Sequence, residues 1–85
     1  MEQFTHTIQD SDGLHARPAG MLAKLAQSCA SDISIQKDGK TADAKRLFSV
    51  MSLSVKTGET ITFRLEGTSA GEDCRKLKEF CKKSL

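Results

Sequence analysis

The 85-residue chain is long enough for one domain but not for two, because half of it could not bury an adequate core. Hydrophobic residues make up 38% and charged residues 28%, a composition that excludes a disordered or membrane-inserted protein. The net charge of +2 is spread without a block of one sign, and four Phe with no Trp or Tyr leave few stacking surfaces for nucleic acid. We therefore expect a single domain over residues 1–85 that binds no nucleic acid and inserts into no membrane.

The first segment with a clear pattern is residues 4–8, where apolar and polar side chains alternate as in a half-buried strand. Phe4, His6 and Ile8 then share one face. His6 could in principle be a ligand or a base. A histidine between two core residues is better interpreted as a packed or edge residue of the strand.

A helix is predicted over residues 16–28, after a turn at residues 11–13. Pro18 suits its first turn, where the missing N–H of proline has no partner to lose. Apolar side chains then recur every three or four residues and form one stripe, made of Ala19, Leu22, Leu25, Ala26 and Cys29.

The middle of the chain predicts a hairpin and a short helix. Ile33 and Ile35 alternate with polar residues, and Asp38-Gly39 favours a type I′ turn into a third strand, because that turn needs positive φ at both central residues. Residues 45–53 then place apolar side chains at helical spacing. Phe48 lies off this stripe, so we expect it to be exposed on the short helix.

The last third of the chain predicts a fourth strand over residues 60–65 and a helix that runs nearly to the end. Ser69 followed by Glu72 has the spacing of a capping box. Lys82 and Lys83 suit the negative end of the helix dipole. One stripe lines this helix, made of Ala70, Cys74, Leu77 and Cys81.

The three cysteines form no C-x-x-C pair, and no apolar leader precedes the first strand, which is typical of a protein from the reducing cytoplasm. Cys74 and Cys81 lie on one predicted helix about 10 Å apart, too far for a disulfide. We therefore expect packed free thiols and a cytoplasmic location.

The element order is β-α-β-β-α-β-α, and every strand has one apolar face. An antiparallel sheet with helices on one side buries all of these faces. The predicted fold is α/β in the α+β sense, an open-faced β-sandwich whose four-stranded antiparallel sheet is covered on one face by three helices.

His15 stands directly ahead of the first predicted helix. The first N–H groups of a helix have no intrahelical acceptor, so the backbone of Ala16 and Arg17 favours an anion at this end. A neutral imidazole nitrogen can attack phosphorus, and the guanidinium of Arg17 can hold the oxygens of a bound phosphoryl group. The pair predicts a phosphate site, although its spacing alone is equally compatible with a solvated loop histidine and a surface charge.

The segment Gly13-Leu14-His15-Ala16-Arg17-Pro18-Ala19 resembles the active-site signature of the HPr family, the histidine-containing phosphocarriers of the bacterial phosphoenolpyruvate-dependent sugar phosphotransferase system. The similarity covers the whole chain, including residues 38–40, 44–53, 58 and 66–67. It implies that His15 takes a phosphoryl group from phosphorylated enzyme I through Nδ1 and gives it to the IIA domains of sugar permeases. Arg17 would stabilise the phosphate, and Pro18 would start the helix that fixes the geometry.

The resemblance also implies a docking surface around the histidine and on the short second helix. We expect an exposed apolar patch of Leu14, Gly20, Leu47, Phe48 and Met51, ringed by Arg17, Lys24, Lys45 and Arg46. For Leu47 and Met51 a place in the core is an equal alternative. A small patch with a basic rim suits brief encounters of a monomer with acidic partners.

Arg46 marks a departure from the family pattern. Many members carry a regulatory serine here, at the start of the second helix, so serine phosphorylation is not expected of this chain. Ser49 and Ser52 are interpreted as ordinary helix-surface residues. The alternative to a carrier is a regulatory module of the same shape that acts on a metabolic enzyme or a transcription factor.

No metal or other cofactor is expected for the carrier or for the regulatory module. The sequence contains no His and Cys cluster with metal-ligand spacing and no glycine-rich phosphate loop. We expect no metal and no other cofactor, and a phosphoryl-transfer intermediate rather than a stand-alone enzyme. The sugars and permeases served do not follow from the sequence.

Overall fold

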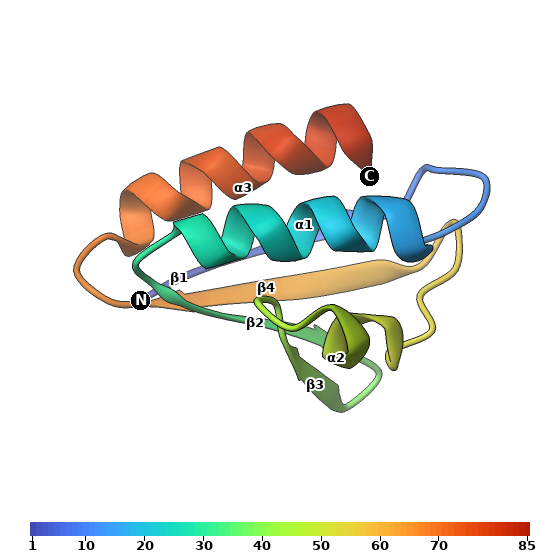
Figure 1. Ribbon diagram of the computed structural model, residues 1–85, viewed down its shortest axis with the longest axis horizontal. Coiled ribbons are helices and arrows are strands. Elements are labelled where there is room, and N and C mark those ends of the chain that lie inside the picture. Colours follow the sequence, from blue (N-terminus) through green and yellow to red (C-terminus); the bar gives the residue numbers. More distant parts are fainter.

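The computed structural model describes residues 1–85 and confirms the predicted element order (Figure 1). The strands are β1 (Glu2–Thr7), β2 (Asp32–Lys37), β3 (Lys40–Asp43) and β4 (Thr60–Glu66). The helices are α1 (Ala16–Ser28), α2 (Leu47–Met51) and α3 (Ala70–Ser84). No helix is both long enough and apolar enough to cross a membrane.

The four strands form one antiparallel sheet in the order β1-β4-β2-β3. α1 and α3 lie antiparallel on one side of it, so that the end of α3 comes close to the start of α1, and α2 packs beside β3 and α1 (Figure 1). The other face carries polar side chains such as Thr5, Thr62 and Arg64 and has no covering layer. The prediction of an open-faced sandwich is therefore confirmed.

The core lies between the helices and the covered face of the sheet. β4 provides its centre, because Ile61, Phe63 and Leu65 are completely buried while the residues between them face outward. From α1 and α3 the largest completely buried side chains are Leu22 and Leu77. Leu25, which the sequence places in the α1 stripe, is only partly buried at the edge of the core.

The hairpin between β2 and β3 turns as the sequence predicts. Asp38 has φ 48° and Gly39 has φ 81°, so both central residues adopt the left-handed conformation that a type I′ turn requires. The strands are in register from Lys37 opposite Lys40 onward.

Two local predictions are wrong. Ser69 is the N-cap of α3, but its side chain makes no capping hydrogen bond, because its backbone has ψ 9° instead of the extended conformation that aims a cap side chain at the helix. α2 is shorter than residues 45–53. Asp43 delays its start, since its side chain and carbonyl accept hydrogen bonds from the backbone N–H groups of Lys45 and Arg46 and hold them in a turn.

The cysteines are free and buried, as predicted for packed thiols. Burial raises the pKa of Cys81 to about 12 and also raises the pKa of Cys29. Both side chains therefore remain neutral thiols at physiological pH, in which form they pack as small apolar groups.

A buried polar contact ties α3 to the turn between α1 and β2. One carboxylate oxygen of Asp73 accepts hydrogen bonds from the hydroxyl of Ser31 at 2.6 Å and from its backbone N–H at 3.1 Å. Ser31 is 1% exposed and Asp73 is 3% exposed. The Ser31 hydroxyl is the main reason that the pKa of Asp73 lies below its ordinary value of 3.8. This carboxylate is thus charged and satisfied inside the fold.

Candidate functional site

His15 is the N-cap residue of α1. Its carbonyl accepts the hydrogen bond of the Ala19 N–H at 2.9 Å, and its side chain makes no capping bond, so the imidazole ring is free to face outward. The ring is 39% exposed. Ala16, Arg17 and Pro18 form the first turn of α1, as predicted. Pro18 is buried and Arg17 is exposed.

The chain before His15 is fixed by the segment that leads into β4. The N–H of Leu14 donates to the carbonyl of Val55 at 3.0 Å, and the side chain of Leu14 is buried. Gly13 has φ +69°, and a Cβ atom there would lie 2.6 Å from the Val55 oxygen. Only glycine fits both this conformation and this close approach. The placement of Leu14 in an exposed docking patch is therefore wrong, because its side chain packs into the core beneath the loop.

Asp10 lies beside the histidine. Its Oδ2 is 3.5 Å from Nε2 of His15, and its Oδ1 accepts a hydrogen bond from the backbone N–H of Asp12 at 3.0 Å. The Asp12 N–H is the main cause that lowers the pKa of Asp10, and His15 and Arg17 lower it further. Asp10 is therefore a carboxylate at neutral pH. The sequence offers no signal for this contact beyond an acidic residue in a turn.

A hollow of about 230 Å³ opens next to the histidine. It brings together Asp10, His15, Arg17, Pro18, Met21, Lys83 and Ser84. Lys83 comes from the last turn of α3, which ends beside the start of α1, so a second cation joins Arg17 at the hollow. The sequence pattern assigned Lys83 only to the helix end. Its proximity to His15 depends on how α3 packs.

The acidic residues around His15 do not define a metal site. Asp10, Asp12 and His15 each place one potential ligand atom within 4.8 Å of the others. All three are at least partly exposed, and exposed acidic groups commonly gather without an ion. We therefore assign no metal to this cluster.

The predicted docking residues fall into two groups. Phe48 is 84% exposed, so its predicted exposure on α2 is confirmed, and Lys24 and Arg46 are exposed as well. Leu47 and Met51 are partly buried against the core, and Gly20 is also partly covered. Met21 is 46% exposed beside His15 and was not among the predicted residues.

Lys45 and the two serines near α2 make local contacts. Nζ of Lys45 donates to the carbonyl of Cys29 at 3.2 Å, so this side chain braces the end of α1 rather than standing free at the rim. The hydroxyl of Ser49 accepts a hydrogen bond from the N–H of Asp43, and the hydroxyl of Ser52 donates to the carbonyl of Ser49. Both hydroxyls thus have structural partners.

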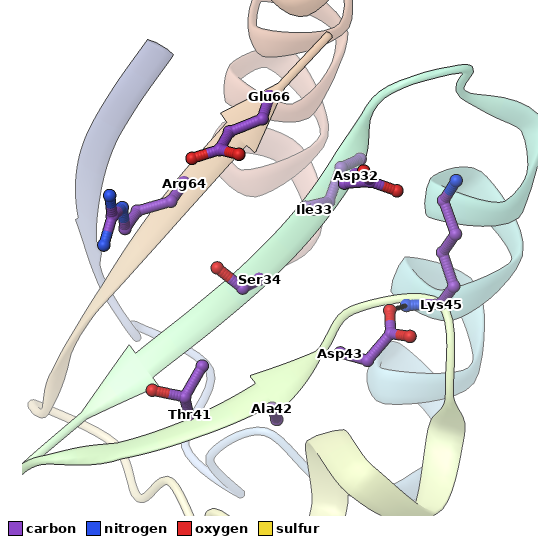
Figure 2. Close-up of a pocket in the computed structure, with 9 residues that line it drawn as sticks. All are labelled: Asp32, Ile33, Ser34, Thr41, Ala42, Asp43, Lys45, Arg64 and Glu66. Atoms are coloured by element: carbon purple, nitrogen blue, oxygen red, sulfur yellow. Dashed lines mark hydrogen bonds between the residues drawn. The ribbon is translucent and has the colours of Figure 1, made fainter. Parts of the chain in front are cut away.

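A larger hollow of about 510 Å³ lies on the uncovered face of the sheet and is lined by residues of β2, β3 and β4 and by Lys45 (Figure 2). Its charges are mixed, with Asp32, Asp43 and Glu66 against Lys45 and Arg64. No residue of α1 or of the His15 loop lines it. Size therefore does not identify the site, and the chemistry points to the smaller hollow at His15.

A histidine at the N-cap position of the first helix of an open-faced sandwich, in a hollow with two cations, is the arrangement expected of a histidine-containing phosphocarrier. Comparison with known proteins supports this class. Residues 2–83 match the family described as "PTS HPr component phosphorylation site". The chain is 38% identical over 79 residues to the phosphocarrier protein HPr of Mycoplasma capricolum, which covers 93% of this chain and 89% of that protein. The chain therefore belongs to the HPr family of phosphocarriers of the phosphotransferase system.

Solved structures support the same assignment. The phosphocarrier protein HPr of Bacillus anthracis is 38% identical, with a TM-score of 0.87 over 94% of this chain and 95% of that one. Crh, the Bacillus subtilis catabolite repression protein, is 33% identical with a TM-score of 0.77 over 100% of this chain and 98% of that one. Crh was found as a dimer with a swapped domain. The family thus includes members that associate.

Proposed function

We propose that His15 accepts a phosphoryl group from phosphorylated enzyme I and passes it to IIA domains of sugar permeases. The observation that carries this proposal is the exposed His15 ring at the N-terminus of α1, with Arg17 and Lys83 at the same hollow. A regulatory module without transfer would not need a nucleophile in this place. The alternative function is therefore less well supported.

In the transfer step, the lone pair of Nδ1 forms a bond to phosphorus while the bond to the donor breaks. The anionic oxygens then meet the free N–H groups of Ala16 and Arg17 and the guanidinium of Arg17. A helix terminus contributes about 0.3–1 kcal/mol in an exposed setting, and a charge-assisted hydrogen bond about 1.5–3 kcal/mol. These magnitudes hold a phosphoryl group that can still be passed on.

The proposal is tested by incubating the chain with enzyme I, Mg²⁺ and phosphoenolpyruvate and measuring its intact mass. We expect one added phosphoryl group, lost on acid treatment as for phosphohistidine. Subsequent incubation with a IIA domain should remove it. Absence of any adduct with a cognate enzyme I would contradict the proposal.

Arg17→Ala is expected to slow transfer without unfolding the protein. Arg17 is exposed and belongs to neither apolar stripe, so its loss removes a charge-assisted contact to the phosphoryl group and little packing. The rate should fall roughly 10- to 100-fold, measured with enzyme I in excess. The control is Arg75→Ala, an exposed arginine on α3 whose loss should change neither rate nor melting temperature. A large loss of stability in Arg17→Ala would show a structural role instead.

We also propose that Phe48, with the exposed parts of Leu47 and Met51, forms the apolar centre of the partner surface, with Gly20, Lys24 and Arg46 around it. Phe48→Ala should weaken binding to enzyme I by roughly 1–2 kcal/mol, as for an aromatic contact residue, with an unchanged melting temperature. Isothermal titration with enzyme I gives the affinity. Binding equal to wild type would remove Phe48 from the surface.

Regulation and assembly follow from the same features. Arg46 has no hydroxyl, so we propose that the serine switch of related proteins is absent here. We further propose that the chain acts as a monomer in the cytoplasm, because a shuttle must leave its surface free for successive partners. Analytical ultracentrifugation tests this, and a stable dimer of the Crh kind would contradict it.

A further inference from the structure

The geometry points to Asp10 as a positioning residue. Its carboxylate accepts a hydrogen bond from Nε2–H of His15 and thereby keeps the reactive lone pair on Nδ1. This inference deepens the proposed function and rests on it. The observation is the carboxylate oxygen of Asp10 at 3.5 Å from Nε2. The contact is made by Nε2, and the proposed transfer uses the other ring nitrogen, Nδ1.

Asp10 is held firmly enough to orient a ring. Its Oδ1 accepts the N–H of Asp12 at 3.0 Å, and its backbone carbonyl accepts the N–H of Gly13 at 2.9 Å. Its own N–H donates to the carbonyl of Leu85 at 3.3 Å. Contacts therefore fix the main chain and one carboxylate oxygen, and the other oxygen is left to the histidine.

The choice of tautomer follows from the hydrogen-bonding capacity of the two groups. A neutral imidazole carries one N–H and one lone pair, whereas a carboxylate only accepts hydrogen bonds. The hydrogen bond made by one ring nitrogen decides which nitrogen carries the proton. With a carboxylate facing Nε2, the proton belongs on Nε2 and the lone pair on Nδ1.

The same contact balances the charge of the transfer step. When the Nδ1 lone pair forms the N–P bond and the donor's bond to phosphorus breaks, the electrons of that bond stay with the donor. Positive charge then develops on the ring, while the proton remains on Nε2 beside the Asp10 carboxylate. On transfer to the acceptor, the N–P electrons return to Nδ1. Asp10 neither gains nor loses a proton.

The distance of 3.5 Å is longer than an ordinary N–H···O hydrogen bond. Contacts of catalytic groups are often long before the substrate arrives and shorten as charge develops. The carboxylate would also repel an incoming phosphoryl group. Its place on the Nε2 side of the ring, with Arg17 and Lys83 at the hollow, limits that cost.

The test is Asp10→Asn in the full chain. Asparagine keeps an oxygen that can accept the Asp12 N–H, so the turn should survive, but its amide can also donate to Nε2. The ¹⁵N chemical shifts of the His15 ring report the tautomer directly. We expect the wild type to favour Nε2–H, and the variant to lose this preference and to take phosphate from enzyme I roughly tenfold more slowly.

The matched control is Asp12→Asn, which removes a second carboxylate near the ring, within 4.8 Å of the ligand atoms of Asp10 and His15, but keeps the backbone N–H that Asp10 accepts. It should leave the tautomer as in wild type. An unchanged tautomer in Asp10→Asn, or an equal change in both variants, overturns the inference. If the wild type takes no phosphate at all, the proposed function fails, whereas the tautomer measurement still decides the contact of Asp10.

Discussion

Replacing His15 with alanine is expected to abolish the acid-labile phosphoryl adduct while leaving the protein folded. The ring makes no capping bond and is well exposed, and the hydrogen bond that begins α1 uses the backbone carbonyl of His15, which alanine retains. The melting temperature should therefore change by only a few degrees, the effect of a surface substitution. Intact mass after incubation with enzyme I and phosphoenolpyruvate gives the readout.

The chain provides its own control, because His6 is the only other histidine. His6→Ala should keep the adduct. His6 lies in β1 with its side chain partly covered, and its Nε2 is buried without a hydrogen-bond partner. The ring is therefore not accessible to a phosphoryl donor. An acid-labile adduct on His15→Ala, or its absence from a folded His6→Ala protein, would show that the phosphoryl acceptor has been misassigned.

Asp73→Ala is expected to cause a large loss of stability. The substitution leaves the hydroxyl and the backbone N–H of Ser31 without an acceptor in a position that is 1% exposed. Buried donors without a partner cost about 1–3 kcal/mol each, so the free energy of unfolding should fall by roughly 3 kcal/mol. For a domain of this size the melting temperature would drop by roughly 10–20 °C.

Glu72→Ala is the matched control, because Glu72 carries the same charge in the same first turn of α3 but is exposed. Its loss should cost only about 0.3–1 kcal/mol through the helix dipole. Equal destabilisation by the two substitutions would mean that the charge near the helix end matters and the buried contact does not.

The contact of Asp73 also predicts a dependence on pH. Its pKa is lowered in the folded state, so its stabilising contribution is fully present above the unfolded value and is lost as the pH falls through the lowered value. Asp73→Asn keeps the acceptor oxygen but not the charge. Urea unfolding should give a higher free energy of unfolding for wild type than for Asp73→Asn at neutral pH. This difference in free energy should become smaller below pH 3.8. A gap that is constant with pH would contradict this account.

The sequence predicts the features that depend on neighbouring residues. The strand and helix periods, the Asp38-Gly39 turn and the place of His15 at a helix start are all set within a few residues, and the structure has each of them. The prediction of a capping box at Ser69 is wrong although the spacing to Glu72 is correct. The capping hydrogen bond depends on the backbone angles of Ser69, which spacing does not determine.

Features that depend on packing were not predicted. Lys83 reaches the hollow only because α3 ends beside α1, and Ser31 meets Asp73 across 42 positions of sequence. Leu14 was placed at the surface because its neighbours carry the site, whereas its backbone and side chain face Val55 and the core. A pattern read along the chain contains no information on these distant partners.

The missing side chain at Gly13 has a consequence for the speed of the carrier. The loop before His15 lies so close to Val55 and Lys56 that a Cβ at Gly13 would clash with their backbones, and its conformational freedom is already lost when the protein folds. A partner that docks at the histidine does not have to order this loop and loses no affinity in doing so. Under the proposed function, weak contacts are then sufficient to align the phosphoryl donor with the acceptor, and the preformed loop lets the two proteins separate quickly after transfer.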